Sequence, residues 1–130
     1  MGNLVYLDTF LTACHSTATV ETYITRRNIN FNNDTEAMLI WPGELLSTSN
    51  NFYIMRYQVS LKESSEAGLT GMINDIITNI NKFNKRLAIG GYTKEATLVH
   101  IEFAYSKRGF INKVGKYYRD IFLDVTWSTA

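Results

Sequence analysis

The most regular pattern in the chain is a stripe of apolar residues between residues 69 and 83. Apolar side chains recur there at steps of three and four, which is the spacing of one face of an α-helix. The members of the stripe are Leu69, Met72, Ile73, Ile76, Ile77, Ile80 and Phe83. Ser64 or Ser65 is expected to cap this helix, and Glu66 places negative charge at the positive end of its dipole. Because β-branched isoleucines are poor helix formers, burial against a broad apolar partner must stabilise the segment.

Three segments, residues 52–61, 97–105 and 117–127, alternate apolar and polar residues. This period of two is typical of strands that bury one face. In the third segment Phe122 falls on the outward face. The residues expected to point inward from the second segment are Val99, Ile101, Phe103 and Tyr105.

Shorter elements are expected in the first half of the chain. A short amphipathic helix is predicted over residues 3–15, an extended segment over 17–31, and a short buried strand over 36–41. A turn is expected at residues 32–34, and the polar run over 45–51 is predicted to be a flexible loop.

The predicted order of elements is α-β-β-β-α-β-β, within a single domain over residues 1–130. Alternating strands leave one face of a sheet in water, which favours antiparallel pairing with the helices on the apolar face. The predicted fold class is therefore α+β, with an antiparallel-dominated twisted sheet of four to five strands packed with two helices.

Composition and charge narrow the classes of function. No apolar run reaches the roughly 18 residues that span a bilayer, and the first residues, with Asp8 among apolar neighbours, are not expected to be a signal peptide. The single cysteine, Cys14, excludes an internal disulfide and is expected to be a small core residue. A net charge of +1 argues against strong non-specific binding of nucleic acid by the whole chain. The charge is divided, however, since residues 1–75 carry a net −4 and residues 76–130 a net +5.

The second half of the chain contains a stretch with basic residues and no acidic ones, between residues 103 and 119. Its basic residues are Lys107, Arg108, Lys113, Lys116 and Arg119. Two interpretations stay open for the loop predicted over residues 106–116. It is either a solvated loop that keeps the protein soluble, or a loop that contacts phosphates or an acidic neighbouring subunit.

Residues that carry enzymatic chemistry are sparse. The run Gly68-Leu69-Thr70-Gly71 lacks the lysine and the spacing of a phosphate-binding loop. Cys14 and His15 are adjacent, so on a helix they point about 100° apart and do not easily chelate a metal together. His100 is interpreted as a surface residue, and the alternative is a base oriented by Glu102 on the same side of a strand. No catalytic, cofactor-binding or metal site is therefore predicted, and the chain is not expected to be an enzyme.

Taken with the length, the order of elements resembles the tail terminator proteins of long-tailed bacteriophages, the lambda-type family. The stretches that carry the resemblance are LVYLDTFLTAC, AMLIWPGE, the strand FYIMRYQVSL leading into the helix MINDIITNINKF, and the closing hairpin LVHIEFAYSKRGFINKVGKYYRDIFLDVTW. Members of the family are of similar size and place a helix first, then three strands, a second amphipathic helix and a final strand pair. Related neck, ring and tail-completion proteins share this fold.

The resemblance implies a structural protein of the virion, assembled in the host cytoplasm. Such proteins form a ring, usually sixfold, that caps the tail tube, stops its polymerisation and presents a surface to the head connector, while DNA passes through the lumen. The implied partners are other copies of the chain, expected to form a hexamer, the tail tube and head connector proteins, and DNA in transient non-specific contact, with no membrane. Opposite net charges in the two halves of the sequence would favour the heterologous contact that a ring needs. The basic stretch is then a candidate for the lumen or for an axial interface.

Other functions fit the same residues. A small cellular α+β module that binds a ligand or dimerises is expected to have a tyrosine-lined pocket and a twofold assembly. A small enzyme would use the histidine and glutamate of the 97–105 strand. A nucleic-acid-binding protein would stack bases on Tyr117-Tyr118 beside Lys116 and Arg119, with an affinity that falls steeply with salt.

Overall fold

The computed structural model describes residues 2–22, 36–111 and 117–129. The described elements are α1 (Gly2–Cys14), β1 (Thr19–Thr22), β2 (Ala37–Ile40), β3 (Glu44–Thr48), β4 (Phe52–Glu63), α2 (Glu66–Asn84), β5 (Leu98–Ile111) and β6 (Tyr117–Ser128). The six strands form one sheet in the order β1-β2-β4-β6-β5, and β3 also pairs with β4. Of these pairs, β1 with β2 is parallel and the others are antiparallel. The predicted α+β fold class is confirmed.

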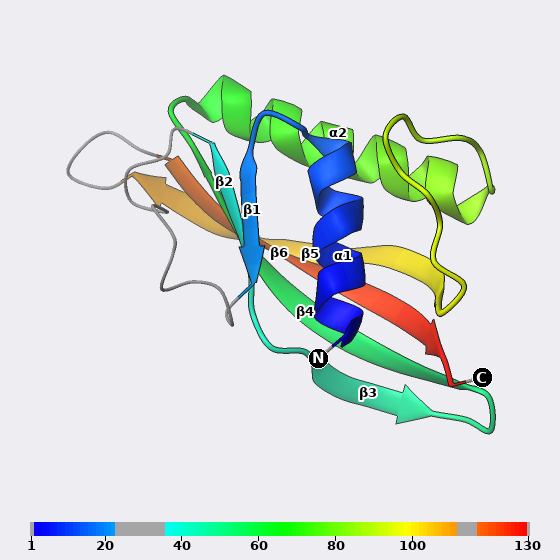
Figure 1. The fold of residues 1–130 in the computed structure, drawn as a ribbon. Helices are drawn as coiled ribbons and strands as arrows, with labels where there is room; N and C mark the ends of the chain where they lie inside the picture. The colour runs from blue at the N-terminus through cyan, green and yellow to red at the C-terminus, as the bar shows by residue number, and fades with distance from the viewer. Residues whose placement is uncertain (1, 23–35, 112–116, 130) are drawn as a thin grey trace.

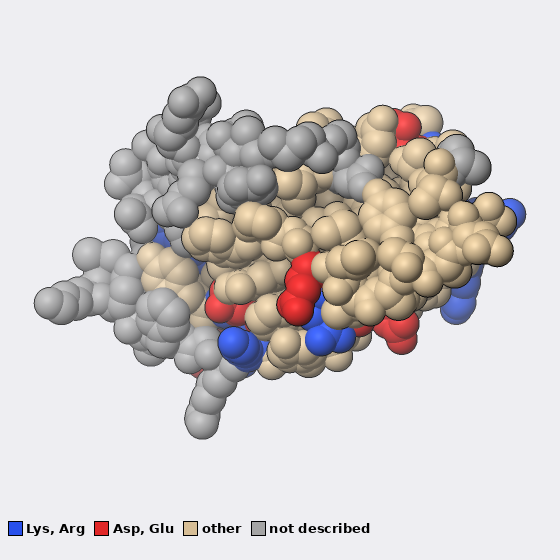
Figure 2. All heavy atoms as spheres, turned by 90° about the horizontal axis from the view of Figure 1, so that it is seen from below, with Lys and Arg blue, Asp and Glu red and all other residues tan. Residues whose placement is uncertain are grey.

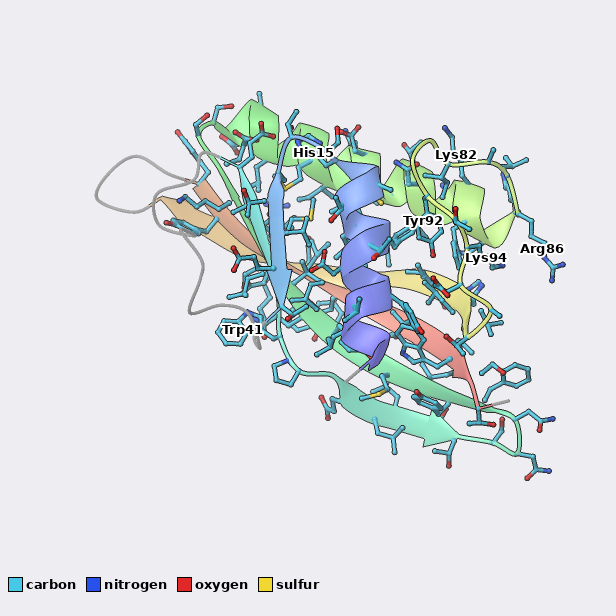
Figure 3. The ribbon with its side chains drawn as sticks, viewed as in Figure 1. His15, Trp41, Lys82, Arg86, Tyr92 and Lys94 are labelled. Atoms are coloured by element: carbon cyan, nitrogen blue, oxygen red, sulfur yellow. The ribbon has the colours of Figure 1, made fainter. Side chains whose placement is uncertain are left out.

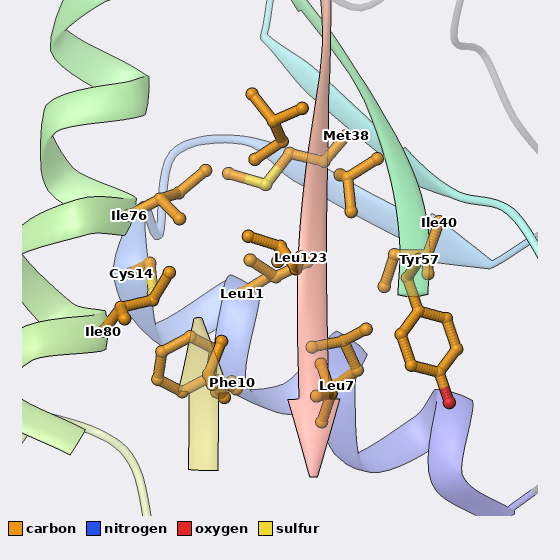
Figure 4. Packing of buried hydrophobic residues seen from close by; sticks show 14 of the residues in the cluster. Leu7, Phe10, Leu11, Cys14, Met38, Ile40, Tyr57, Ile76, Ile80 and Leu123 are labelled. Carbon is orange, nitrogen blue, oxygen red and sulfur yellow. The ribbon is translucent and has the colours of Figure 1, made fainter. Parts of the chain in front are cut away.

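Both helices lie on the same face of the sheet (Figure 1). Leu7 and Leu11 of α1 and Ile76 of α2 belong to one buried cluster with Met38 of β2 and Leu123 of β6 (Figure 4). The core therefore lies between the helices and one face of the sheet. Among the described elements, no helix covers the opposite face.

The two predicted helices are confirmed. α2 begins at Glu66 and ends at Asn84, and the hydroxyl of its N-cap, Ser65, accepts a hydrogen bond from the Gly68 N–H at 2.9 Å. The buried residues of α2 are Leu69, Met72, Ile76, Ile80 and Phe83. α1 likewise buries the apolar side of its sequence against the sheet, with Phe10 and Cys14 inside the core. Burial thus stabilises the isoleucine-rich helix, as its low intrinsic propensity requires.

The prediction of a flexible loop over residues 45–51 is wrong. Glu44–Thr48 forms β3, an exposed strand that pairs antiparallel with β4. The Ser49 N–H donates a hydrogen bond to the Phe52 carbonyl at 2.8 Å and helps to close the turn between the two strands. An exposed edge strand forms through backbone hydrogen bonds, so its side chains need not alternate. This strand brings the sheet to six strands, beyond the four to five predicted.

The strand predicted over residues 97–105 is longer than expected. β5 continues to Ile111, so the described half of the loop predicted over 106–116 is strand, paired with β6 through Lys107 and Asp120. Backbone hydrogen bonds again extend a strand through a polar segment in which the side chains do not alternate and so do not predict a strand.

Tyr105 does not point inward as predicted. The register of β5 against β6 shifts between Phe103 and Tyr105, and the Tyr105 side chain is 42% exposed. A β-bulge adds one residue to one strand and so inverts the alternation of the residues that follow it. An earlier shift, between Leu98 and His100, accompanies complete burial of Leu98, whereas Val99, which was expected inward, is half-buried.

Parts of the first half of the chain lie outside the described residues. These include the turn predicted at residues 32–34 and most of the extended segment predicted over 17–31, of which β1 is the described part. No helix in the described part of the chain combines the length and apolar character needed to cross a membrane.

Candidate functional site

The structure describes two of the five basic candidates in full, Lys107 and Arg119. Lys107 is exposed near the end of β5, and its Nζ lies 5.4 Å from the centroid of the Phe122 ring. Arg119 is half-buried in β6. The side chains outside the described set are those of Arg108, Lys113 and Lys116. A common role for the five in assembly stays a prediction.

The face of the sheet without helices carries aromatic rings between polar side chains. We call it the open sheet face; its residues are Trp41, Arg56, Gln58, Ser60, Tyr105, Asp120, Phe122 and Asp124. Its strand residues alternate with buried ones such as Tyr57 and Leu123, because successive side chains of a strand point to opposite faces. The alternation of β4 and β6 in the sequence therefore determines most of this surface.

At the centre of the open sheet face, two rings and one ion pair are in contact. Tyr105 and Phe122 stack with ring centroids 4.4 Å apart and an interplanar angle of 16°. Arg56 donates from Nε to Asp124 Oδ1 at 2.7 Å and from Nη2 to Asp124 Oδ2 at 2.9 Å. These hydrogen bonds raise the pKa of Arg56 further above its ordinary value. The Arg56 guanidinium also lies 5.3 Å from the centroid of the Tyr105 ring.

A second polar chain lies beside this centre. The Trp41 indole N–H donates to Ser60 Oγ at 2.9 Å, and Ser60 Oγ donates to Asp120 Oδ1 at 2.8 Å. A hollow of about 180 Å³ lies between Trp41, Arg56, Tyr105 and their neighbours. Arg56 and Asp124 are paired, and the Tyr105 ring is 42% exposed above the buried Phe122 ring. Arginine and exposed tyrosine are enriched in surfaces that contact other proteins.

Acidic and basic side chains are mixed on the side of the molecule seen from below (Figure 2). Uncharged residues cover most of the described surface in that view, and blue and red groups stand close together. A surface that binds nucleic acid through phosphates has clustered positive charge. The described surface in this view has no such cluster.

Three strand edges have no strand partner among the described residues, the outer edges of β1, β3 and β5. In the β3–β4 hairpin the apolar side chains of Leu45, Leu46 and Phe52 are 57%, 42% and 43% exposed. On β5, the Asn84 amide at the end of α2 donates to the Ile101 carbonyl at 2.6 Å and accepts from the Ile101 N–H at 3.1 Å. An exposed strand edge is a template for pairing with another chain.

Another polar cluster that joins distant parts of the sequence is centred on His15. His15 follows α1, and its Nδ1 lies 2.7 Å from Asp75 Oδ2 of α2. Its Nε2 lies 2.5 Å from Oε2 of Glu36, the residue before β2. The Glu63 carboxylate, at the end of β4, completes the group. We call these four side chains the His15 junction; Figure 3 labels His15 beside α1.

The carboxylates determine the protonation of the His15 junction. Burial of the imidazole lowers the pKa of His15, but the hydrogen bonds to Glu36 and Asp75 raise it by more, so that the net pKa lies above its ordinary value. The same hydrogen bond from His15 lowers the pKa of Glu36. The sequence alone did not reveal this group, because its members are far apart and follow no common periodicity. The one available signal was the place of Glu63 two residues after Leu61, where it continues the series Tyr57, Val59 and Leu61 on the apolar face of the strand.

The structure describes the three residues that were weighed for catalysis, His100, Glu102 and Cys14. His100 and Glu102 are exposed on β5, and Cys14 is buried in the core. Burial raises the pKa of the Cys14 thiol to about 12, which leaves it protonated and a poor nucleophile near neutral pH.

A pocket of about 420 Å³ lies beside the last turns of α2. It is lined by residues that include Phe83, Arg86, Ile89, Tyr92 and Lys94, several of which gather there in Figure 3. The Lys94 Nζ stands 4.6 Å from the centroid of the Phe83 ring. Its lining contains one tyrosine, whereas the ligand-binding alternative predicted a pocket lined by several.

Comparison with known proteins finds a likeness in structure. The fold is similar to that of a chain in the virion of a native gene transfer agent (GTA) particle, with a TM-score of 0.60 at 12% sequence identity. The match covers 98% of this chain and 90% of the other. No protein-family model and no curated protein matches the chain. At this identity, the comparison establishes that the two chains share a fold.

Proposed function

We propose that this protein is a structural subunit of a virion and acts without enzymatic activity. The observation that carries the proposal is the shared fold over 98% of the chain with a component of a gene transfer agent virion. Nearly complete coverage in both directions means that the likeness includes the helical layer as well as the sheet. Within the virion, the proposed role is that of a tail terminator or neck subunit that caps the tail tube and joins it to the head.

The exposed surfaces of the protein support a role in assembly. Subunits of a closed ring need two different surfaces that complement each other. The β3–β4 hairpin, with exposed Leu45 and Phe52, offers an apolar strand edge, and the open sheet face offers rings and paired charges. These surfaces belong to one subunit and differ in chemistry, as a heterologous contact requires. A hexameric ring, with tail tube and head connector proteins as partners and DNA passing through its lumen, is part of the proposal.

The test is the mass of the purified protein in solution by light scattering, together with negative-stain images, first alone and then with assembled tail tubes of the same particle. A hexamer or other ring with a central hole, or a ring that forms at the end of the tubes, is the expected result. A compact dimer that ignores the tubes would contradict the proposal and favour a small α+β binding module instead.

A further inference from the structure

We propose that His15, Glu36 and Glu63 form a binding site for one divalent metal ion of the zinc type. One imidazole nitrogen and one oxygen of each carboxylate lie within 4.8 Å of one another. The three side chains come from the end of α1, the residue before β2 and the end of β4. A bound ion would therefore join three elements that are far apart in the sequence. This proposal does not depend on the role of the protein in a virion.

The donor atoms match the chemistry of such an ion. Imidazole nitrogen and carboxylate oxygen bind Zn²⁺ at about 2.0–2.2 Å, so ligand atoms around a tetrahedral ion lie about 3.4 Å from one another. In the structure the three donors lie within 4.8 Å of one another, and His15 Nε2 and Glu36 Oε2 are 2.5 Å apart, so the side chains would rotate to admit an ion. Three protein ligands leave the fourth position of the ion for water.

Each of the three donors is held by a second partner, as ligands in metal sites commonly are. The Asp75 carboxylate lies 2.7 Å from His15 Nδ1 and can hold a proton there. Nε2, which lies 2.5 Å from Glu36 Oε2, would then bind the ion in place of its hydrogen bond to that carboxylate. Glu63 Oε1 accepts a hydrogen bond from the Ser64 N–H at 2.8 Å, which orients this carboxylate. The Thr17 hydroxyl donates to Glu36 Oε2 at 3.1 Å.

The charges of the junction also favour a cation. The Glu63 residue is only 6% exposed, yet its carboxylate contacts that of Glu36. Two ionised carboxylates in contact repel each other unless a proton or a cation lies between them. Together with Asp75, the junction contains three carboxylates and one imidazole, so a divalent ion bound to the neutral imidazole would reduce its net charge from −3 to −1.

The packing around Glu63 makes its position part of the fold. Gly68, in the first turn of α2, leaves room for this side chain, because a Cβ atom there would lie 2.4 Å from Glu63 Cγ. The Glu63 side chain therefore lies directly against the helix and is directed toward the junction.

The experiment is calorimetric titration of the EDTA-treated full chain with Zn²⁺, with the melting temperature followed in parallel. The wild type should bind one ion per chain and melt at a higher temperature with Zn²⁺. Glu63→Gln, which keeps the shape of the side chain, should weaken binding at least tenfold, and Asp75→Asn should weaken it about 10- to 100-fold by misorienting His15.

His100→Ala is the matched control, because the chain has two histidines and His100 is exposed on β5. It should bind Zn²⁺ as the wild type does. Circular dichroism of the metal-free variants separates loss of binding from loss of fold, and Asp75, which is half-exposed, provides the variant that leaves the core intact. Absence of saturable one-to-one binding, or equal affinity in Asp75→Asn and the wild type, would overturn the proposal in favour of a metal-free ion-pair network.

Discussion

Inside the core, the Trp127 indole N–H donates a hydrogen bond to Tyr57 Oη at 3.0 Å. Both side chains are almost completely buried, and their rings meet edge to face with centroids 6.4 Å apart. Trp127 ends the buried face of β6, and Tyr57 lies in the middle of β4. The pair therefore fixes a polar contact in an otherwise apolar layer, where an unpaired N–H is costly.

We expect Tyr57→Phe to lower the free energy of unfolding by about 1–3 kcal/mol, because it leaves the indole N–H of Trp127 buried without an acceptor. Urea unfolding followed by tryptophan fluorescence measures the change. Tyr105→Phe is the control, since its hydroxyl belongs to a side chain that is 42% exposed, and it should change stability by less than about 0.5 kcal/mol. Equal effects of the two substitutions would show that the buried hydrogen bond adds no stability beyond that of an exposed tyrosine hydroxyl.

The stability of the protein should fall as the pH rises above 9, in part through Cys14. Burial, and secondarily the charge of Asp75, raises the pKa of the thiol from 9.0 to about 12. Between these values the unfolded chain releases the thiol proton while the folded chain keeps it, so rising pH favours unfolding, by up to about 1.4 kcal/mol per pH unit for one group. Urea unfolding between about pH 8 and pH 11 should give a shallower pH dependence for Cys14→Ala than for the wild type. Parallel curves would mean that the thiol ionises equally in both states.

At the scale of elements, the two glycines of α2 have opposite surroundings. A Cβ at Gly68 would lie 2.4 Å from Glu63 Cγ, whereas a Cβ at Gly71 would meet nothing within 4 Å. Glycine within a helix costs about 0.5–1 kcal/mol relative to alanine unless space requires it. The first glycine thus serves the packing of β4 against α2, and the second does not.

Gly71→Ala should raise the free energy of unfolding by about 0.5–1 kcal/mol, and Gly68→Ala should lower it by about 1–2 kcal/mol because the buried Glu63 side chain must move. Thermal or urea unfolding of the two variants forms a matched pair in one helix. If both substitutions stabilise the protein, the contact between Glu63 and the helix can be relieved without cost.

Also at this scale, the side chain of Asn84 joins the end of α2 to the edge of the sheet through hydrogen bonds like those between strands. Asn84 exchanges a pair of hydrogen bonds with the backbone of Ile101, as a neighbouring strand residue would. The end of the helix and the beginning of β5 are therefore fixed relative to each other. This contact limits where another chain can pair along the outer edge of β5.

At the scale of the whole molecule, assembly into a ring would place the basic end of the β5–β6 hairpin against the lumen or an axial neighbour. Substitution of Lys107 and Arg108 by glutamate is then expected to abolish joining while leaving the monomer folded, because Lys107 is exposed and contributes little to the core. Particle joining, or ring formation on tail tubes, is the measurement. Lys82→Glu with Lys85→Glu makes the same change of charge at two exposed positions at the end of α2 and directly after it, and it should leave joining intact. Normal joining by the Lys107 and Arg108 variant would remove the hairpin from the assembly surface.

The layers of the molecule follow from patterns that are local in the sequence. The stripe from Leu69 to Phe83 and the alternation around Tyr57 and Leu123 predict both the elements and the faces that they bury, since helix and strand periods differ. Burial of Cys14 and the outward direction of Phe122 were predicted in the same way and agree with the structure. These features depend on which residues are apolar and how they are spaced, and both properties can be read directly from the sequence.

The tertiary structure alone decided the features that depend on contacts between segments far apart in the sequence. β3 exists because the backbone of β4 offers hydrogen bonds to a polar segment, and Tyr105 faces outward because a shift of register inverts the alternation of β5. The His15 junction needs the end of α1, the start of β2, the end of β4 and α2 to meet at one place. A single sequence specifies hydrophobic period directly, but it specifies register and long-range polar contacts only through the packing of the whole chain.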